Sequence, residues 1–396
     1  MPGPALTTQV AIVGAGPAGS LLAVMLHHAG IESVVIERQS REHVLSRIRA
    51  GVLEWGTVEV LRANSLGARM DAEGHIHTET GIAYGGEHLF YFDIGRYAHT
   101  QFMSYGQTMI QEDLYSAADQ LGLTILFEVD DVALRDVTSD GPTVVFTHDG
   151  QHKRLDCEFV VGCDGFHGPA KSAFPASVLR TYEKSYPFGW LGILSETPPL
   201  EHIVYCNSPR GFALASQRNP MLSRYYVQCP LDDTVDDWPD ARFWDELLAR
   251  YPDQVSSQIV TGPSIEKSIA PLRSFVAEPM RYGNLFLAGD AAHIVPPTGA
   301  KGLNLAVSDV FYLSRALAHH YTEHDDHYLD CYSEMALRRV WAAVRFSWWM
   351  TSLLHRFPEQ TAIDQRLQEA ELAYLHHSEK AQAAISEQYA GMPFES

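Results

Sequence analysis

Short apolar runs alternate with amphipathic stretches from the start of this chain, and their order predicts an α/β fold. Residues 10–13 and 33–36 are largely β-branched runs, which are typical of buried parallel strands. Between them, residues 20–29 form an apolar stretch that predicts a helix, and Gly30 follows at the position favoured for ending one. Buried strands of the same kind are predicted further along the chain at 159–161 and 284–287.

The rest of the pattern predicts a second sheet and a helical C-terminal region. The second sheet comprises strands at 188–194, 202–206, 211–217 and 224–228. β-structure is also predicted over 74–107, followed by strands at 123–127, 132–135 and 143–146. Helices are predicted at 53–63, at 110–121, up to about 318 after the turn near residue 300, and from 336 onward.

Three glycines follow the first strand at the spacing G-x-G-x-x-G, namely Gly14, Gly16 and Gly19. Glycines here let the backbone approach a pyrophosphate, whose charge would lie at the N-terminus of the helix. The second strand ends at Glu37, where a carboxylate accepts a hydrogen bond from a ribose hydroxyl. A glycine turn made only for packing is the alternative. Because strand, helix, second strand and acid stand in register, we predict a Rossmann-like nucleotide site.

Two later strands also run into turns that carry an acid. The first, 159–165, is equally compatible with a plain turn after a strand. The second, 284–304, places Asp290 among small residues that leave space for a flat ring. The helix that follows begins near Lys301, and its N-terminus offers donors to an anionic or electron-rich edge. We interpret this segment as the platform for the half of a dinucleotide that the glycine turn does not hold.

Charge and composition limit the partners. The chain has 396 residues and a net charge of −20, which argues against nucleic acid or an anionic membrane as a partner. The five cysteines include no CxxC pair, so reduced thiols and no metal site are expected. The first residues lack a basic leader, and no apolar stretch is long enough to span a bilayer. We therefore predict a soluble cytoplasmic protein that binds a small anion in a local cationic pocket.

Two segments offer cations for that pocket. A loop after the second strand carries Arg38, Arg47 and Arg49, for which phosphate contact and a solvated face are equally compatible. The second sheet carries groups suited to a small aromatic anion: Tyr205, Ser216, Arg218, Arg224, Tyr225 and Tyr226. The pattern alone favours a plainer interpretation, with the tyrosines packed in the core and the arginines in water.

A patch of rings on the C-terminal helices indicates core or a dimer surface: Trp341, Phe346, Trp348 and Trp349.

Three stretches carry a family resemblance: GAGPAGS, GCDGFHG and LAGDAAHIVPPTGAKGLN, in this order. Together they resemble the single-component flavoprotein aromatic hydroxylases. Six further stretches narrow the resemblance to members acting on 4-hydroxybenzoate: RIRAGVLE, YPFGWLG, PRGFALASQR, SRYYVQ, GPSIEKSIAPLRSF and RFSWWMTSLLHRFP. The resemblance covers essentially the whole chain.

The resemblance implies a discontinuous Rossmann-like FAD-binding domain, an interleaved β-sheet substrate domain and a C-terminal helical region. The implied boundaries are 1–75, 100–185 and 272–345 for FAD, 76–99 and 186–271 for substrate, and 346–396 for the helices. It also implies that FAD occupies the glycine turn while the nicotinamide cofactor visits transiently, and that the protein is a homodimer. The implied FAD-binding residues are Gly14, Gly16, Gly19, Glu37, Arg47, Arg49, Gln107, Arg224, Asp290, Pro297, Thr298, Lys301, Leu303 and Asn304.

Within that set the resemblance gives Glu37 the adenosine ribose and Asp290 the ribityl chain. For the substrate, it implies that Arg218, Ser216 and Tyr226 hold a carboxylate. Tyr205 and Pro297 would lie at the phenol end, and Tyr389 and His77 would carry the phenolic proton outward. Arg224 matches an arginine that is coupled to flavin movement.

The implied reductant is NADPH, with NADH as the alternative. The residues that match the family's nicotinamide contacts are Arg38, Arg41, Arg49, His167, Lys171 and Arg273. The chain departs from the family's NADPH-preferring pattern at two positions, so a smaller preference for NADPH over NADH is expected. Lys171 stands where the NADPH-preferring pattern has an arginine, and His43 stands where that pattern has a tyrosine. A lysine keeps the charge but loses the bidentate geometry.

The chemistry implied is hydroxylation of 4-hydroxybenzoate to 3,4-dihydroxybenzoate with O₂. Electrophilic attack on a benzene ring needs an electron-rich ring, which a phenol provides only as it approaches the phenolate. Phenols titrate near pH ~10, and a dry pocket raises that value. A tyrosine bonded to the phenolate, with an exit for the proton, offsets this cost. A related aromatic acid, such as a 3-hydroxy or amino analogue, and a non-enzymatic nucleotide-binding protein are the alternatives.

Overall fold

A computed structural model describes residues 6–46 and 51–394. A six-stranded sheet forms the base of the molecule. The strand order is β19-β20-β13-β2-β3-β9, with every neighbouring pair parallel except β19 with β20. The strands are β2 (Val10–Val13), β3 (Ser33–Ile36), β9 (Thr124–Leu126), β13 (Phe159–Gly162), β19 (Arg281–Tyr282) and β20 (Leu285–Leu287). The four buried strands predicted from apolar runs are thus neighbours in one sheet, and β2 lies at its centre.

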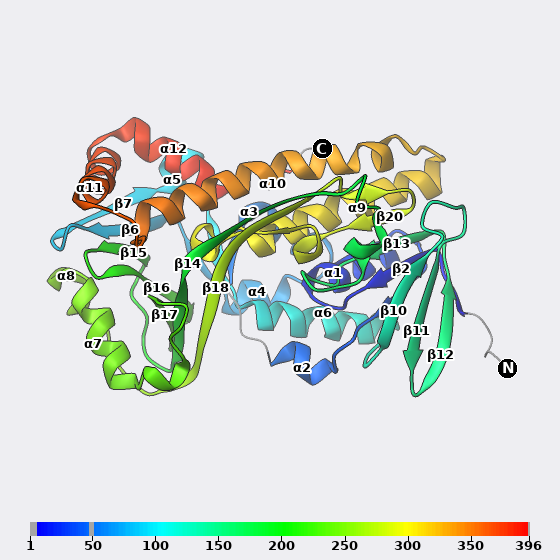
Figure 1. Ribbon diagram of the computed structural model, residues 1–396, viewed down its shortest axis with the longest axis horizontal. Helices are drawn as coiled ribbons and strands as arrows, with labels where there is room; N and C mark the ends of the chain where they lie inside the picture. Colours follow the sequence, from blue (N-terminus) through cyan, green and yellow to red (C-terminus); the bar gives the residue numbers. More distant parts are fainter. Residues whose placement is uncertain (1–5, 47–50, 395–396) are drawn as a thin grey trace.

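Helices pack on this sheet and on one another (Figure 1). α1 (Pro17–His28) contacts both α6 (Gln107–Leu121) and α9 (Gly302–Glu323). α1 begins three residues before the predicted start, because proline is well suited to the first turn of a helix. The other helices of the N-terminal 130 residues are short: α2 (Arg41–Leu45), α3 (Trp55–Ala63), α4 (Ala68–Glu73) and α5 (Ile94–Ala98).

Two smaller sheets lie beside the base. One has the order β1-β12-β11-β10, built from β1 (Leu6–Thr7), β10 (Asp130–Arg135), β11 (Thr143–His148) and β12 (Gln151–Asp156). The other has the order β4-β8-β5, built from β4 (Val52–Glu54), β5 (His75–His77) and β8 (Phe102–Ser104). The helix predicted from residue 53 therefore starts only at Trp55, because the preceding residues pair with β8.

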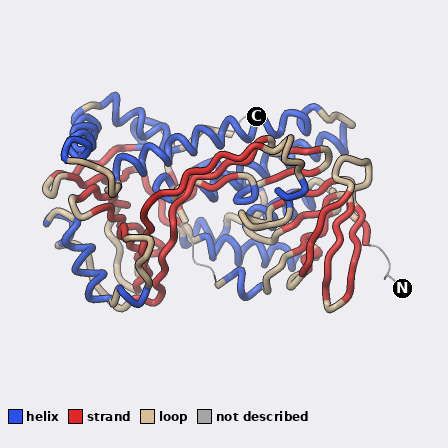
Figure 2. Tube along the Cα trace, in the orientation of Figure 1, coloured by secondary structure: helices blue, strands red, loops and turns tan. Residues whose placement is uncertain are grey.

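An eight-stranded sheet extends away from the base, in the order β21-β18-β14-β17-β16-β15-β6-β7. Its strands are β6 (Glu79–Tyr84), β7 (His88–Asp93), β14 (Arg180–Ser195), β15 (Ile203–Ser208), β16 (Gly211–Asn219), β17 (Leu222–Cys229), β18 (Ser264–Glu278) and β21 (His293–Ile294). Figure 2 shows the long paired ribbon of β14 and β18, which joins this sheet to the base. The four strands predicted between 188 and 228 are confirmed, and β14 begins eight residues earlier than predicted.

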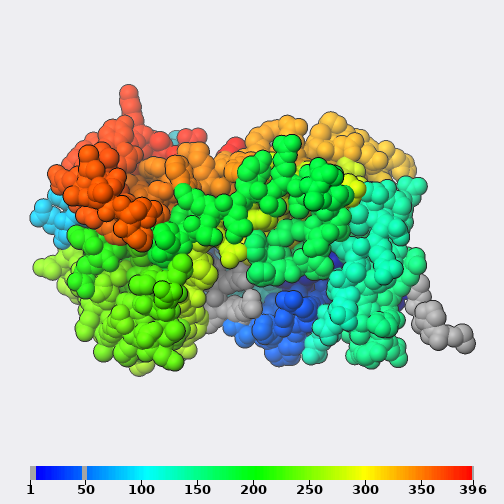
Figure 3. All heavy atoms as spheres, viewed as in Figure 1, coloured from blue at the N-terminus to red at the C-terminus, as the bar shows by residue number. Residues whose placement is uncertain are grey.

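Helices at the C-terminal end complete the molecule. α10 (His327–Leu354) runs along both parts, and α11 (Ala362–His377) and α12 (Glu379–Ala390) follow it (Figure 1). α7 (Asp240–Arg250) packs on the outer sheet, α8 (Asp253–Ser256) follows it, and neither was predicted. In the space-filling view of Figure 3, these light-green residues and the teal β10–β12 sheet lie at opposite ends of the face. No helix of the described ranges is long and apolar enough to cross a membrane.

The ring patch on α10 is divided between core and surface. Phe346 is buried against the outer sheet, and Trp349 is partly buried beside it. Trp341 and Trp348 keep 37% and 43% of their area exposed. The helical period explains the division, because these two tryptophans lie on the outer face of α10.

Candidate functional site

The turn between β2 and α1 is tightly packed at Gly14 and Gly19 and open at Gly16. Gly14 has a φ of +105°, and a Cβ there would lie 2.3 Å from the carbonyl oxygen of Cys163. A Cβ on Gly19 would lie 1.9 Å from the carbonyl oxygen of Gly14, so the helix packs directly on the turn. Around Gly16, by contrast, a Cβ would meet no atom of the described residues within 4 Å. The open side of Gly16 is the side that faces a cavity.

Glu37 stands at the end of β3, beside this turn, as predicted. One carboxylate oxygen accepts a hydrogen bond from the backbone nitrogen of Ala15 at 2.8 Å, and the other accepts from Gln39 nitrogen at 2.8 Å. These bonds hold the carboxylate in place at the cavity wall. Each oxygen retains a further lone pair for a ligand hydroxyl.

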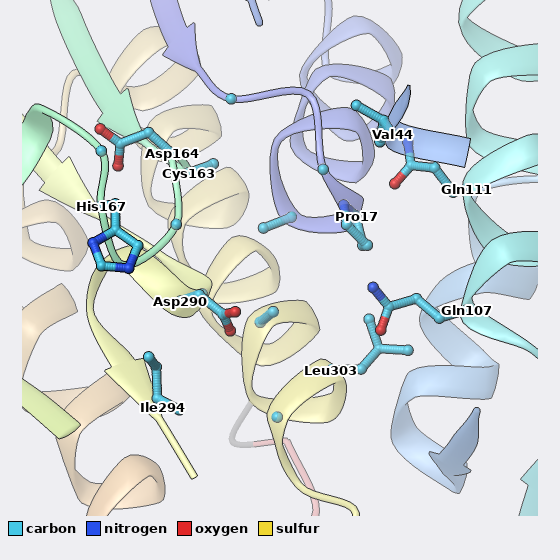
Figure 4. Close-up of a pocket in the computed structure, with 18 of the residues that line it drawn as sticks. Pro17, Val44, Gln107, Gln111, Cys163, Asp164, His167, Asp290, Ile294 and Leu303 are labelled. Atoms are coloured by element: carbon cyan, nitrogen blue, oxygen red, sulfur yellow. The ribbon is translucent and has the colours of Figure 1, made fainter. Parts of the chain in front are cut away.

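A single cavity of about 930 Å³ connects the turn with the outer sheet. It passes from Gly16 and Glu37 along Gln107 and Asp290 to Trp190 and Tyr226. In Figure 4 Asp290 lies on one side of it, and Leu303 and Gln107 lie close together on the other side. A cavity that runs from the glycine turn to the outer sheet is suited to a dinucleotide with a second ligand at the sheet end.

The second platform is held from behind by a buried carboxylate. Asp309, on α9, accepts a hydrogen bond from the backbone nitrogen of Gly289 at 2.8 Å and lies 2.6 Å from Nε2 of His293. Both ends of the turn that carries Asp290 are thereby tied to one side chain. Asp309 was not predicted, because nothing in its helical context distinguishes it from an ordinary polar residue.

Lys301 lies at the start of α9 and is fully engaged inside the protein. Its ammonium donates to Glu54 and to the carbonyl oxygen of Tyr389, at 2.7 Å each. Glu54 also pairs with Arg339 at 2.6 Å, so two cations share one carboxylate in this cluster. Burial lowers the pKa of Lys301, while Glu54 opposes that shift. The cluster therefore leaves a positive field near the N-terminus of α9.

Asn304 and Thr298 stand in the layer behind the cavity wall. The Asn304 amide accepts from Glu54 nitrogen at 2.9 Å and donates to the carbonyls of Val52 and Ala300. Thr298 bonds to Thr351 at 2.8 Å. Their contacts thus fix the loop that carries Pro297, which does line the cavity.

Arg218 and Arg224 are buried, with only 7% and 3% of their area exposed. The interpretation that placed these arginines in water is therefore wrong. Arg224 pairs with Glu266 at 2.7 Å and bonds to Ser268 at 3.2 Å. The burial escaped prediction because it depends on segments that are distant in the chain, such as β18, whose Glu266 and Ser268 lie 42 and 44 positions from Arg224.

Arg218 differs from Arg224 in having no carboxylate within salt-bridge distance among the described residues. Its guanidinium bonds only to neutral oxygens, the carbonyl of Gln217 at 2.7 Å and the Ser216 hydroxyl at 3.4 Å. Its Nε has no partner in the described part of the chain, and burial lowers the pKa of the guanidinium. Tyr226 lies beside it, with its ring under the Arg224 guanidinium. A buried guanidinium with free donors is suited to a carboxylate ligand.

Two buried tyrosines meet on the same side of the outer sheet. The hydroxyl oxygens of Tyr205 and Tyr389 lie 3.1 Å apart, and burial raises the pKa of both groups. The centroid of the Phe102 ring lies 5.5 Å from that of the Tyr389 ring and 5.2 Å from that of the His77 ring. His77 is buried, its Nε2 has no partner among the described residues, and burial lowers its pKa to about 3. The predicted relay residues thus gather around one ring.

The predicted nicotinamide contacts are more dispersed. Arg38 and His167 line the cavity, and His167 points into it in Figure 4. Arg41 instead makes two bonds to Asp119, at 3.0 and 2.6 Å. The Lys171 ammonium donates to the Phe166 carbonyl at 2.7 Å.

Arg273 stacks over the Phe166 ring at 4.6 Å and lies 3.8 Å from Glu183. Arg47 and Arg49 lie outside the described residues. The basic loop that contains them therefore stays a prediction.

Asp164 and Trp190 also line the cavity, although neither was predicted to. Burial raises the pKa of Asp164 to about 6, and its Oδ2 accepts from the backbone nitrogen of Ala170 at 2.7 Å. The acid at the end of the 159–165 strand was a usable signal, since it repeats the strand, glycine and acid order seen at Asp290. Trp190 carries no such signal.

Comparison with known proteins gives concordant results. A family described as an FAD binding domain matches residues 7–347. The p-hydroxybenzoate hydroxylase of Acinetobacter baylyi is 48% identical over 392 residues, which are 98% of this chain and 96% of that protein. A rifampicin monooxygenase of Streptomyces venezuelae is 28% identical over 316 residues, which are 78% of this chain and 64% of that one. The solved structure of p-nitrophenol 4-monooxygenase from Pseudomonas putida superposes with a TM-score of 0.81 at 19% identity, covering 98% of this chain and 99% of that one.

Proposed function

This chain belongs to the FAD-dependent aromatic hydroxylases, and from that membership we propose that it converts 4-hydroxybenzoate to 3,4-dihydroxybenzoate with NADPH and O₂. The Acinetobacter protein, to which it is similar over nearly its whole length, bears the name p-hydroxybenzoate hydroxylase. One observation of the site gives this substrate its strongest support. It is the buried guanidinium of Arg218, whose Nε has no partner and which has no carboxylate within salt-bridge distance among residues 6–46 and 51–394.

The carboxylate of a hydroxybenzoate would complete that guanidinium. Arginine binds a carboxylate through two parallel hydrogen bonds, which fixes the orientation of the ring as well as its position. Ser216 and Tyr226 stand beside Arg218 to accept or donate the remaining bonds. The opposite end of the substrate would then reach toward the Tyr205 hydroxyl. A para-hydroxyl would suit such a placement, because the carboxylate and the phenol of 4-hydroxybenzoate lie on one axis of the ring.

The residues present fit FAD. The open side of Gly16 would admit the pyrophosphate, Glu37 would accept from the adenosine ribose, and Asp290 would bind the ribityl chain. The N-terminus of α9 and the cation pair around Glu54 would face the electron-rich edge of the ring system. When bound, FAD takes electrons from the nicotinamide cofactor and activates O₂.

The protein's own groups prepare the substrate. Tyr205 would hold a hydrogen bond at the phenolic oxygen, so that the phenol shares its proton with a neighbouring hydroxyl. Tyr389, 3.1 Å beyond Tyr205, would take the proton onward, and His77 would pass it to the surface. His77 suits this role because burial keeps it neutral and leaves Nε2 free to accept.

The outer sheet and the C-terminal helices would exclude water from the reaction. Trp190, Tyr205 and Phe346 belong to one buried aromatic cluster at that end of the cavity. A dry pocket strengthens each polar contact to the substrate. It also keeps water away from the activated oxygen, so that fewer side reactions compete with hydroxylation. Arg38 and His167 at the cavity would receive NADPH. We further propose a homodimer, and a division into the three regions expected from the sequence.

A substrate panel tests the proposal against related acids. The holoprotein would be titrated with 4-hydroxybenzoate, 3-hydroxybenzoate and 4-aminobenzoate while the flavin absorbance is followed. We expect 4-hydroxybenzoate to bind at least tenfold more tightly than the 3-hydroxy isomer, whose hydroxyl is displaced from the Tyr205 axis. Tighter binding of either analogue would assign the enzyme to a different aromatic acid.

A further inference from the structure

Four buried rings stack on one another where the outer sheet meets the C-terminal end of α10. Phe188 and Trp190 come from β14, Phe212 comes from β16, and His355 directly follows α10. The His355 ring lies nearly parallel to Phe188 and to Phe212, at centroid distances of 4.8 and 4.2 Å. Trp190 stacks on Phe212 at 4.6 Å. His355 is fully buried, and none of the roles described above uses it.

Both ring nitrogens of His355 have partners, and together these define its state. Nε2 lies 2.7 Å from the indole nitrogen of Trp190, which can only donate, so Nε2 accepts. Nδ1 lies 2.9 Å from the carbonyl oxygen of Thr351, which can only accept, so Nδ1 carries the hydrogen. The ring is therefore a single neutral tautomer. Burial is consistent with this, since it lowers the pKa of His355 to about 3.

The same turn of α10 also holds the loop that carries Pro297. The Thr351 hydroxyl donates to the carbonyl of Ser347 at 2.7 Å, so it accepts from the Thr298 hydroxyl at 2.8 Å. Thr298 is next to Pro297, which lines the cavity. The last turn of α10 and the residue after it thus fix two separate parts of the cavity wall. One part is the Pro297 loop, and the other is the indole of Trp190.

Trp190 stands in the wall beside the site proposed for the carboxylate. Its ring packs on Tyr226 at 5.0 Å, and Tyr226 lies beside Arg218. If the indole lost its acceptor, a buried donor would be left unpaired, which is costly in a dry core. Rotation of the side chain into the cavity would let the N–H reach water. The rotated ring would then occupy space that an aromatic acid needs.

We propose that His355 is a positioning residue, which holds Trp190 in the cavity wall by accepting its indole N–H and thereby sets the affinity for the aromatic acid. The identity of that acid rests on the proposed function, whereas the bond itself does not. His355 acts through Trp190 and touches no reacting group. Its loss should therefore raise KM while kcat changes little, and the effect should require the indole N–H.

The first experiment needs no substrate. The holoprotein is labelled with ¹⁵N-tryptophan, and exchange of each indole proton with D₂O is followed by NMR, with Trp190→Phe assigning the Trp190 signal. We expect the Trp190 proton to exchange at least tenfold faster in His355→Leu than in the wild type. The internal control is Trp244, whose buried indole donates to the carbonyl of Gly262 and should keep its rate. An unchanged Trp190 rate, or equal acceleration of both protons, would overturn the proposal.

The second experiment uses the enzyme with 4-hydroxybenzoate. His355→Leu should raise KM about tenfold with kcat within threefold of the wild type. His355→Gln, whose side-chain carbonyl can accept from the indole, should restore most of the affinity and also covers the case in which the leucine variant folds poorly. In a Trp190→Phe background, His355→Leu should change KM by less than twofold, because no indole N–H remains.

If the increases in KM caused by His355→Leu and by Trp190→Phe multiply in the double variant, His355 acts on the substrate by another route. A wild-type holoprotein that does not turn over 4-hydroxybenzoate would contradict the proposed function instead. The exchange rates would still decide whether His355 holds Trp190.

Discussion

The hydroxyl oxygens of Tyr205 and Tyr389 lie 3.1 Å apart in the buried region between the outer sheet and α12, although the two residues are 184 positions apart in the chain. Either hydroxyl can donate to the other, so a proton on one side of the pair can be exchanged for a proton on the other. A phenol placed beside Tyr205 would therefore have a route by which its proton leaves. This relationship underlies the proposed activation of the substrate.

Tyr205→Phe should keep the fold and the bound FAD but lose coupled hydroxylation. Without the tyrosine hydroxyl, the substrate phenol has no partner with which to share its proton in the dry pocket. NADPH oxidation should then yield hydrogen peroxide in place of 3,4-dihydroxybenzoate, measured as the ratio of the two products. Tyr225→Phe is the matched control, because Tyr225 is a buried tyrosine of the same sheet whose ring belongs to a different cluster. Full product yield in Tyr205→Phe would remove that tyrosine from the mechanism.

Arg218→Ala should weaken binding of the aromatic acid by about 2–5 kcal/mol, because the carboxylate would be buried without a counterion. The dissociation constant is measured by titrating the flavin absorbance with 4-hydroxybenzoate. Arg210→Ala is a suitable control, since that arginine is exposed on the β15–β16 turn and pairs with Glu246 at the surface. An affinity in Arg218→Ala equal to that of the control would contradict the assignment of the carboxylate site.

NADPH should be preferred over NADH, with a smaller margin than a site with arginine in place of Lys171 would give. Arg38 at the cavity and Arg41 beside it suit a 2′-phosphate, while Glu42 repels it. Arg41 is also engaged with Asp119, which limits its contribution. The two values of kcat/KM, measured at the same ionic strength, decide the point. A higher kcat/KM with NADH would show that Glu42 and Asp119 outweigh the arginines.

Asp164→Asn should stabilise the protein at pH 8 more than at pH 5. Burial raises the pKa of Asp164 from 3.8 to about 6 in the folded protein. The folded state therefore binds this proton more tightly than the unfolded chain. Its contribution to stability is fully present below pH 3.8 and is lost as the pH rises through about 6, by about 1–3 kcal/mol in total.

Asparagine removes that pH-dependent loss and keeps an acceptor for the backbone of Ala170. The comparison is made by thermal unfolding of the holoprotein at the two pH values. Asp140→Asn, at an exposed position, should leave the thermal stability unchanged at both pH values. Equal shifts at pH 5 and pH 8 in Asp164→Asn would contradict the raised pKa.

The parts that sequence could predict are those whose chemistry is local. The turn from Gly14 to Gly19 and the acid at Glu37 lie within one strand–helix–strand unit, so their spacing alone defines the geometry. The parts that escaped depend on contacts between distant segments. Lys301 and Glu54 are 247 positions apart, and no local pattern distinguishes this pair from surface charges. The resemblance named residues for the substrate pocket, but only the fold buries the Arg218 guanidinium, with no carboxylate partner in the part of the chain that the structure describes.

The central claim is that this chain hydroxylates 4-hydroxybenzoate, and NADPH oxidation by the purified holoprotein tests it most directly. The rate is measured with and without 4-hydroxybenzoate under air, and the product is identified by its mass. We predict that the acid accelerates NADPH oxidation at least tenfold and that about one molecule of 3,4-dihydroxybenzoate, heavier than the substrate by one oxygen atom, forms for each NADPH consumed. Oxidation that is unaffected by the acid, or that proceeds without a hydroxylated product, would contradict the claim.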